Sequence, residues 1–188
     1  LFVTGFDREN LVLDVIGTQR NNDKVRVLID NLQNPEGPSL VYCATRKNVE
    51  DVTVHLRSNG IDAGMYHAGL SMEDRIAVQE GFMNNDFHVV VATNAFGMGI
   101  NKPNIRFTVH YTMPSSLEAL YQEGGRAGRD GNDAECFVLF TPEPDKIGDE
   151  IHSIETNVSV LSEYTKPFSR GDFRTQLYMT INQILQSL

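Results

Sequence analysis

Residues 87–111 read FHVVVATNAFGMGINKPNIRFTVHY, two apolar runs joined by a turn that contains two glycines. The first run, residues 87–93, is a continuous β-branched segment, which is typical of a strand buried on both faces. The second run, residues 105–111, predicts another strand. Strands without a polar face belong to parallel sheets that helices cover on both sides, so this stretch indicates an α/β fold.

The flanking sequence alternates between strand and helix, which supports the same fold class. Further strands are predicted at residues 10–16, 39–43, 63–66 and 135–140, and helices at residues 23–34 and 115–124, from 47 to 59 and from 71 onward. Ligands of parallel sheets bind at the carboxyl ends of the strands. The expected binding loops therefore follow Cys43, Tyr66, Thr93 and Tyr111.

Periodicity also predicts which helical side chains face the sheet, because these recur at steps of three and four residues. The expected inward residues are Val25, Leu28, Ile29 and Leu32 in the first helix, Val49, Val52 and Leu56 in the second, and Met72, Ile76 and Met83 in the third. Ser71, with Asp74 three residues later, predicts a capping box at the start of the third helix.

Composition changes after residue 141. This change divides the chain into a main domain, residues 1–141, and a helical extension, residues 142–188, to which no role is assigned. Apolar residues recur at helical spacing at Ile147, Ile151, Ile154, Val158 and Leu161. Packing of this helix on the main domain and a short coiled coil both agree with the pattern. Residues 173–185 predict a last helix.

The chain carries 16 Lys and Arg against 25 Asp and Glu, a net charge of -9. Taken alone, this argues against nucleic acid, which basic surfaces bind. Residues 143–163 hold much of the acidity, however, so the charge of the main domain does not exclude such a partner. No apolar run is long enough to span a membrane, and no membrane partner is expected. The chain has no initiator Met, which indicates a piece of a longer protein.

Two cysteines, Cys43 and Cys136, lie in apolar runs and form no CxxC pattern. We expect buried, reduced thiols. Two such cysteines cannot form a zinc site, so no metal ligands are assigned.

Residues 122–131, QEGGRAGRDG, are the densest functional signal. Glycine lets the backbone approach a ligand closely, and arginine offers a planar, permanently charged fork that suits phosphate. Arg126 and Arg129 are three residues apart, so on a helical turn they share a face and can address one polyphosphate. A glycine-rich turn with solvated arginines is the alternative for this stretch taken alone.

Three other segments place polar residues after predicted strands, where they can hold phosphates without reading base sequence. These segments are VYCATRK, residues 41–47; MYHAGLS, residues 65–71; and VVVATNAFGMGIN, residues 89–101. Together with the arginine segment, all are expected at the carboxyl-end loops of the sheet.

In this order, the four segments resemble the C-terminal motor-lobe motifs of superfamily 2 helicases, and RecQ-family DNA helicases most closely. The resemblance covers roughly residues 5–141 and starts with FDREN, residues 6–10, which is similar to the FDRxN motif at the start of this lobe. DEAD-box RNA helicases typically begin the last motif with His-Arg, whereas this chain has Gln122 and Glu123 there. The resemblance implies a RecA-like fold.

The resemblance also implies ATP hydrolysis between two lobes of one polypeptide, with ATP and Mg²⁺ bound mainly by the first lobe. That lobe is absent from this chain, which has no GxxxxGK[ST] motif. A DExH string at residues 149–152 lies in the acidic helix rather than after a buried strand and is rejected as its acidic box. Arg129 is the implied arginine finger, with Arg126 beside it. The implied nucleotide-contacting residues are Gln122, Gly125, Arg126, Arg129, Gly99 and Asn101.

The implied partner is single-stranded or forked DNA. The residues expected to hold its backbone are Thr45, Arg46, His67, Gly69, Thr93 and Asn94. A capping or core histidine is the alternative for His67. The enzyme would act in the cytoplasm of a bacterium or the nucleus of a eukaryote, and this chain alone is expected to be inactive. Two alternatives stay open: a lobe of a superfamily 2 RNA helicase, and a nucleic-acid-binding module without motor function.

Overall fold

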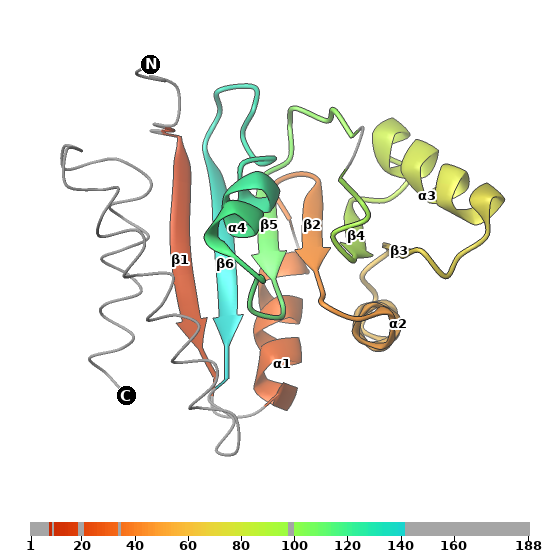
Figure 1. Ribbon diagram of the computed structural model, residues 1–188, viewed down its shortest axis with the longest axis horizontal. Helices are drawn as coiled ribbons and strands as arrows, with labels where there is room; N and C mark the ends of the chain where they lie inside the picture. Colours follow the sequence, from red (N-terminus) through yellow and green to blue (C-terminus); the bar gives the residue numbers. More distant parts are fainter. Residues whose placement is uncertain (1–7, 9, 19–20, 34, 98–99, 142–188) are drawn as a thin grey trace.

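The computed structural model describes residues 8, 10–18, 21–33, 35–97 and 100–141. This part of the chain forms one parallel sheet with the strand order β1-β6-β5-β2-β4-β3. The strands are β1 (Leu11–Gly17), β2 (Ser39–Tyr42), β3 (Ala63–Tyr66), β4 (Val89–Ala92), β5 (Phe107–His110) and β6 (Ala134–Phe140). The helices are α1 (Asn21–Leu32), α2 (Arg46–Ser58), α3 (Met72–Asn84) and α4 (Leu117–Gly124). The α/β prediction is confirmed, with β1 at one edge of the sheet (Figure 1).

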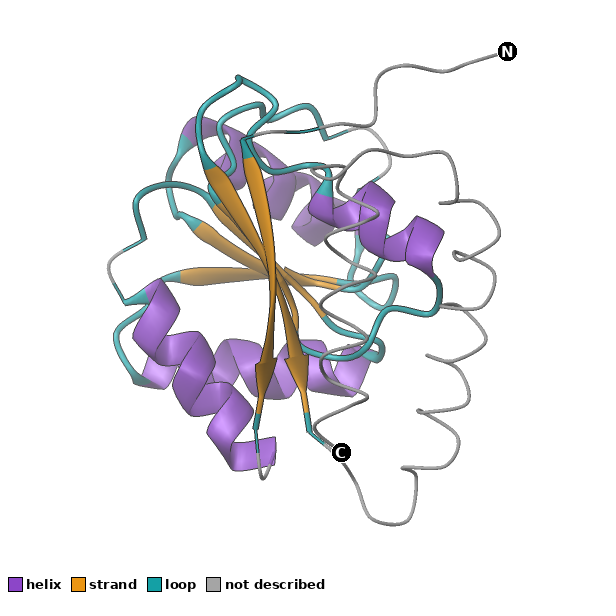
Figure 2. Cartoon of the chain, turned by 90° about the vertical axis from the view of Figure 1, so that its left-hand side faces the viewer, coloured by secondary structure: helices purple, strands orange, loops and turns teal. Residues whose placement is uncertain are grey.

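Helices lie on both sides of the twisted sheet (Figure 2). Successive side chains of a strand point to opposite faces, so each central strand supplies two separate cores. Leu40 and Val90 pack in the core under α3 and α4, whereas Val41 and Val91 pack in the core under α1 and α2. All four residues of β2 and of β4 are buried, which explains the uninterrupted apolar run from which the fold was predicted.

Helix α2 confirms the predicted inward residues, and α1 confirms Leu28, Ile29 and Leu32, whereas Val25 is only half-buried and is not part of this core. Leu28 and Leu32 of α1, and Val49, Val52 and Leu56 of α2, lie in the core on that side. Thr45 caps α2 because its side-chain oxygen accepts a hydrogen bond from the Asn48 N–H at 3.1 Å.

The prediction for α3 is wrong. Met72, Ile76 and Met83 are 70%, 44% and 39% exposed, and the buried residues are Gly81 and Phe82. Apolar residues occur on opposite sides of this helix, so spacing could not select the inner face. The packing of the Phe87 ring selects the buried face of α3. The ring lies so close to Gly81 that a Cβ built there would be 2.7 Å from its Cε1. The predicted cap does form, and Ser71 Oγ accepts from Asp74 N at 3.0 Å.

The connection from β4 to β5 spans the sheet without a regular helix in the described residues. It is tied down by Lys102, whose Nζ donates to Met83 O at 3.2 Å and to Asn85 Oδ1 at 2.8 Å at the end of α3. Because β2 lies between β4 and β5 and all three strands are parallel, this connection leaves the carboxyl end of β4 and returns to the amino edge of the sheet before β5 begins.

Cys43 and Cys136 are buried free thiols, as predicted, and burial raises the pKa of each to about 12. Among the helices that the structure describes, none has the length and apolarity to cross a membrane. The predictions for residues 142–188, including their helices, lie outside the described residues.

Candidate functional site

Three arginine side chains from distant parts of the chain line one pocket, which we call the arginine pocket. Its volume is about 350 Å³, and its lining residues are Arg8, Leu11, Tyr121, Gln122, Gly125, Arg126 and Arg129. None of these residues is acidic. A pocket with this lining favours an anion, because each guanidinium keeps its charge at any physiological pH.

Helix α4 and the loop behind it, residues 125–133, place two of these arginines. Ser116 caps the helix by accepting from Ala119 N at 3.1 Å. The loop then lies beside the start of the strands: Gly128 N donates to Ile105 O at 2.8 Å, just before β5. Gly128 has φ +61, and a Cβ there would lie 2.8 Å from Asn132 O, so the turn requires glycine.

The expectation that this whole loop lies with the other motifs at the carboxyl ends of the strands is wrong. The hydrogen bonds of its backbone are with residues that precede β1, β5 and β6, at the amino ends, and only the Arg126 side chain reaches the loop after β4, at Gly97. The physical reason is the direction of α4. The helix begins after the carboxyl end of β5, and the chain must return to the amino edge before parallel strand β6 can start.

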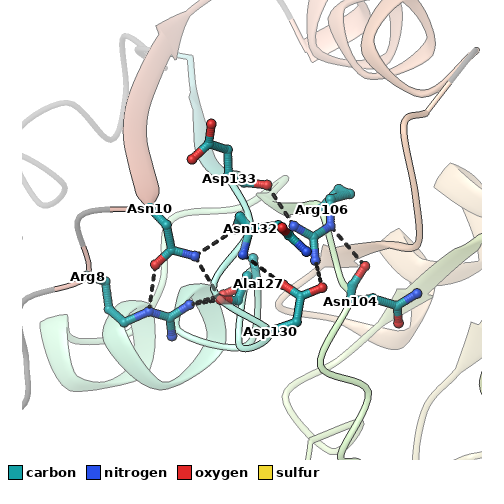
Figure 3. A network of polar contacts seen from close by, with 9 residues as sticks. Arg8, Asn10, Asn104, Arg106, Ala127, Asp130, Asn132 and Asp133 are labelled. Carbon is teal, nitrogen blue, oxygen red and sulfur yellow. Dashed lines mark hydrogen bonds and ion pairs between the residues drawn. The ribbon is translucent and has the colours of Figure 1, made fainter.

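Arg8 and Asn10 fasten the loop from the other end of the chain (Figure 3). Arg8 Nη2 donates to Ala127 O at 2.7 Å and also to Gly128 O, while Arg8 Nη1 donates to Gly125 O at 3.4 Å. Asn10 Nδ2 donates to Gly128 O at 2.8 Å. The FDREN segment pointed only to the family resemblance, and no role was expected for Arg8. The signal in the sequence was the polar pair Arg8 and Asn10, at the start of the predicted first strand.

An ion pair between Arg106 and Asp130 stabilises the side of the loop away from Arg8 (Figure 3). Arg106 Nη2 lies 2.5 Å from Asp130 Oδ2, and its Nη1 donates to Asp133 O at 2.8 Å. Hydrogen bonds, first from Arg106 and then from Asn132, together lower the pKa of Asp130 to about 2. Asp130 is therefore ionised and bound to Arg106.

Arg126 lies against Gly97 in the loop after β4. A Cβ built at Gly97 would lie 2.9 Å from Arg126 Cζ and closer still to Nη2. Its Nε is buried and has no hydrogen-bond partner within the described residues. A half-buried guanidinium without a bonded carboxylate has donors available for an anionic ligand.

The other residues expected at the nucleotide do not all line the arginine pocket. Arg129 is exposed, with Nε donating to Gly125 O at 3.3 Å, and Gln122 is exposed at the same pocket. Asn101 is exposed but is not part of the arginine pocket lining. Gly99 lies outside the described residues.

A second pocket, the strand-end pocket, opens at the carboxyl ends of β2, β4 and β5. Its volume is about 160 Å³, and its lining residues are Tyr42, Cys43, Ala44, Asn94, His110, Thr112, Met113, Pro114, Ser115 and Glu123. Asn94 is the residue here that was expected to contact nucleic acid. Thr93, one residue earlier, binds Tyr66 O through its N–H at 3.1 Å and joins two of the loops.

Arg46, His67 and Gly69 come together beside β3, as the resemblance implied. A Cβ at Gly69 would lie 3.1 Å from both Arg46 Nη1 and His67 Nδ1. His67 is 4% exposed; its Nδ1 accepts from Gly69 N at 3.1 Å, and its Nε2 lies 3.4 Å from Glu50 Oε1. This burial favours the capping alternative for His67, which shapes the loop while Arg46 is exposed at its surface.

A metal site has no support in the described part of the chain, where no group of three or more His, Cys, Asp or Glu side chains could hold an ion.

Known proteins share this sequence pattern. The family described as "Helicase conserved C-terminal domain" matches residues 23–131. The ATP-dependent DNA helicase RecQ of Bacillus subtilis is 44% identical over 140 residues, which cover 74% of this chain and 23% of that protein. The RecQ-like DNA helicase blm-1 of Caenorhabditis elegans is 44% identical over 142 residues, or 75% of this chain and 14% of that protein. The chain thus spans less than a quarter of either relative.

The fold also matches solved structures. The crystal structure of a DEAD box protein from Methanococcus jannaschii superposes with a TM-score of 0.65 at 24% identity, covering 76% of this chain and 39% of that one. This likeness confirms the expected RecA-like fold of the described lobe.

Gly97→Ala is expected to displace the Arg126 guanidinium while leaving the lobe folded, because only the flexible end of that side chain blocks a Cβ. The Arg126 Nε–H resonance should shift in NMR spectra, and the melting temperature should fall by no more than about 4 °C. Gly17→Ala is the matched control, since a Cβ there meets nothing within 4 Å. An unchanged Arg126 resonance would contradict this packing.

Asp130 predicts an acid-dependent part of the stability. Its pKa is lowered from 3.8 to about 2, so its ion pair stabilises the fold above about pH 4, and this stability is lost as the pH falls towards 2. Urea unfolding should therefore show Asp130→Asn less stable than wild type at pH 5 and equally stable near pH 2. Asp62→Asn, at an exposed position, controls for loss of a charge. A difference that stays constant with pH would rule out the ion pair as its cause.

Proposed function

Because the chain belongs to the family of helicase conserved C-terminal domains, we propose that it is the second motor lobe of an ATP-dependent, RecQ-type DNA helicase. Its neighbour in the complete protein would be the first motor lobe of the same polypeptide. That protein would act in the cytoplasm of a bacterium or the nucleus of a eukaryote.

The observation that carries this proposal is the arginine pocket. Arg8, Arg126 and Arg129 line it without an acidic residue, and within the described residues Arg126 forms no ion pair with a carboxylate. Phosphoryl transfer spreads negative charge over the phosphoryl oxygens in the transition state, and a positioned guanidinium stabilises that charge. The pocket therefore fits the polyphosphate of ATP as substrate.

Different arginines would have different tasks in this reaction. Arg129 would act as the arginine finger, because it lines the pocket and is exposed, so its guanidinium can reach a nucleotide that enters from the other lobe. Arg126 would bind the polyphosphate beside it. Gln122 and Gly125 complete the wall near the nucleotide, and Asn101 would meet it only through lobe closure. Gly99 is proposed as a further nucleotide contact from the resemblance alone. Mg²⁺ would be held mainly by the first lobe and would neutralise phosphate charge there.

The carboxyl-end loops would hold single-stranded or forked DNA through its backbone. Arg46 starts α2 at this edge, and the N-terminus of a helix favours phosphate. Thr45 and Gly69 shape the approach to it, and Asn94 and Thr93 line the next loop. Opening and closing of the two lobes around ATP would then move this surface along the strand.

Arg129→Ala in the complete protein is expected to lower DNA-stimulated ATP hydrolysis by roughly 10³-fold or more, while nucleotide binding changes little, because a finger acts mainly in the transition state. Steady-state hydrolysis and equilibrium binding of a labelled ATP analogue measure the two effects. Arg26→Ala, with a side chain 84% exposed on α1, is the matched control.

The isolated 188-residue chain provides the complementary result, since it should show no ATP hydrolysis without the first lobe. Hydrolysis by this chain, or normal turnover by Arg129→Ala, would overturn the assignment. Unwinding assays on DNA and RNA duplexes distinguish the RecQ-type function from an RNA helicase. A protein that binds strands but unwinds neither would instead be a binding module.

Arg46→Ala is expected to weaken single-strand binding and flatten its salt dependence, since each lost phosphate contact lowers the slope of log K against log salt by about 0.7. Fluorescence anisotropy of a labelled oligonucleotide over a salt series measures this slope. Arg26→Ala again serves as control and should leave the slope unchanged. An unchanged slope in Arg46→Ala would make this arginine a structural residue.

A further inference from the structure

Arg8 lines the arginine pocket, but most of its guanidinium is bound by the protein itself (Figure 3). Nε donates to Asn10 Oδ1 at 3.2 Å, and Nη1 donates to Gly125 O at 3.4 Å. Nη2 donates to two carbonyls, Ala127 O at 2.7 Å and Gly128 O. A guanidinium has five N–H groups, so these four hydrogen bonds leave at most one, on Nη1, for a ligand.

The carbonyls bound by Nη2 lie between the two other arginines of the pocket. Ala127 and Gly128 are the residues that separate Arg126 from Arg129 in the sequence, and both are buried. The Gly128 N–H is bound as well, because it donates to Ile105 O at 2.8 Å. The turn that sets Arg129 relative to Arg126 is therefore held by Arg8 on one side and by the sheet on the other.

Arg8 and Arg129 also share an acceptor. Arg8 Nη1 and Arg129 Nε both donate to Gly125 O, at 3.4 and 3.3 Å, and a carbonyl oxygen has two lone pairs for two such donors. Gly125 is itself held at the end of α4, since its N–H donates to Tyr121 O at 2.9 Å. A single backbone carbonyl thus joins Arg8 to the guanidinium proposed as the arginine finger.

Asn10 fixes the direction of the Arg8 side chain. Its Oδ1 accepts from Arg8 Nε, while its Nδ2 donates to Gly128 O at 2.8 Å and to Asn132 O at 2.6 Å. A lysine at position 8 would keep the positive charge, but a compact ammonium cannot replace a planar fork that bonds Asn10 and three carbonyls together. Charge and hydrogen-bond geometry can therefore be separated at this position.

We propose that Arg8 is a positioning residue for ATP hydrolysis, which orients Arg129 through Gly125 O and the turn at Ala127 and Gly128 rather than binding the phosphates itself. A misplaced finger loses contacts that form in the transition state, so an effect on turnover should exceed any effect on nucleotide binding. The proposal deepens the proposed function and rests on it.

Arg8→Lys in the complete protein tests this role, with ATP hydrolysis measured at saturating single-stranded oligonucleotide. The substitution should lower kcat about tenfold or more, while equilibrium binding of a labelled ATP analogue weakens less than about threefold, since the charge remains and the fork is lost. Arg26→Lys, with a side chain 84% exposed on α1, is the matched control and should hydrolyse ATP normally.

Two results of this experiment would overturn the proposal. Analogue binding that weakens as much as kcat falls would make Arg8 a phosphate ligand. An unchanged kcat would show that the hydrogen bonds of the fork are not needed for hydrolysis.

A double-mutant cycle tests whether Arg8 acts through Arg129. In the Arg129→Ala protein, Arg8→Lys should lower kcat by less than about threefold more, because the group that it positions is gone. Losses that multiply would show that Arg8 acts independently of Arg129, which contradicts the proposal.

Thermal melting shows whether Arg8→Lys is folded at the assay temperature. If it is not, Asn10→Ala tests the same link, because it removes the acceptor of Arg8 Nε. We expect a lower kcat with analogue binding retained, and normal turnover by folded Asn10→Ala would count against the proposal.

The same assay separates the two levels of inference. A wild-type protein without DNA-stimulated hydrolysis would refute the proposed function. An active wild type in which the Arg8 and Arg129 losses multiply would refute only the positioning role.

Discussion

The arginine pocket depends on the hydrogen bonds that Arg8 donates to the loop after α4. The carbonyls it reaches, from Gly125 to Gly128, lie 117 to 120 positions away in sequence. A guanidinium carries five donors in a rigid fork, so one side chain can hold several carbonyls of an irregular turn. Arg8 also precedes β1, which pairs with β6, the strand into which the loop leads. It therefore fastens both ends of the connection that places Arg126 and Arg129.

The net charge of the chain does not describe the charge at the arginine pocket, because that depends on which arginines form ion pairs. The whole chain is acidic, at -9, yet the four arginines around the loop after α4 divide into two groups. Arg8 and Arg106 bind carbonyls and Asp130 and stabilise the loop. Within the described residues, Arg126 and Arg129 form no ion pair with a carboxylate, and both line the arginine pocket. Because Asp130 of this loop is bound to Arg106, its charge does not neutralise the pocket.

Much of the fold was predictable because its signals are local. A strand buried on both faces needs apolar residues at every position, and residues 89–92 show this directly. Helices α1 and α2 have one apolar face, so spacing identified it. Helix α3 has apolar residues on several sides, and there the packing of Phe82 against Phe96, with Phe87 against Gly81, selects the buried face. The predicted location of the loop after α4 was wrong for a related reason. The order of the motifs in the sequence does not say at which edge of the sheet a helix ends.

The sequence by itself determined the fold class and most strand and helix positions, and it supplied the segments proposed to bind phosphate, because each of these follows from neighbouring side chains. Only the tertiary structure decided that Arg8 belongs to the arginine pocket, that His67 is buried, and that Glu123 lies beside His110. Those relations join residues on separate strands and loops. Their distances are set by the packing of α4 on the sheet, which leaves no periodic trace in the sequence.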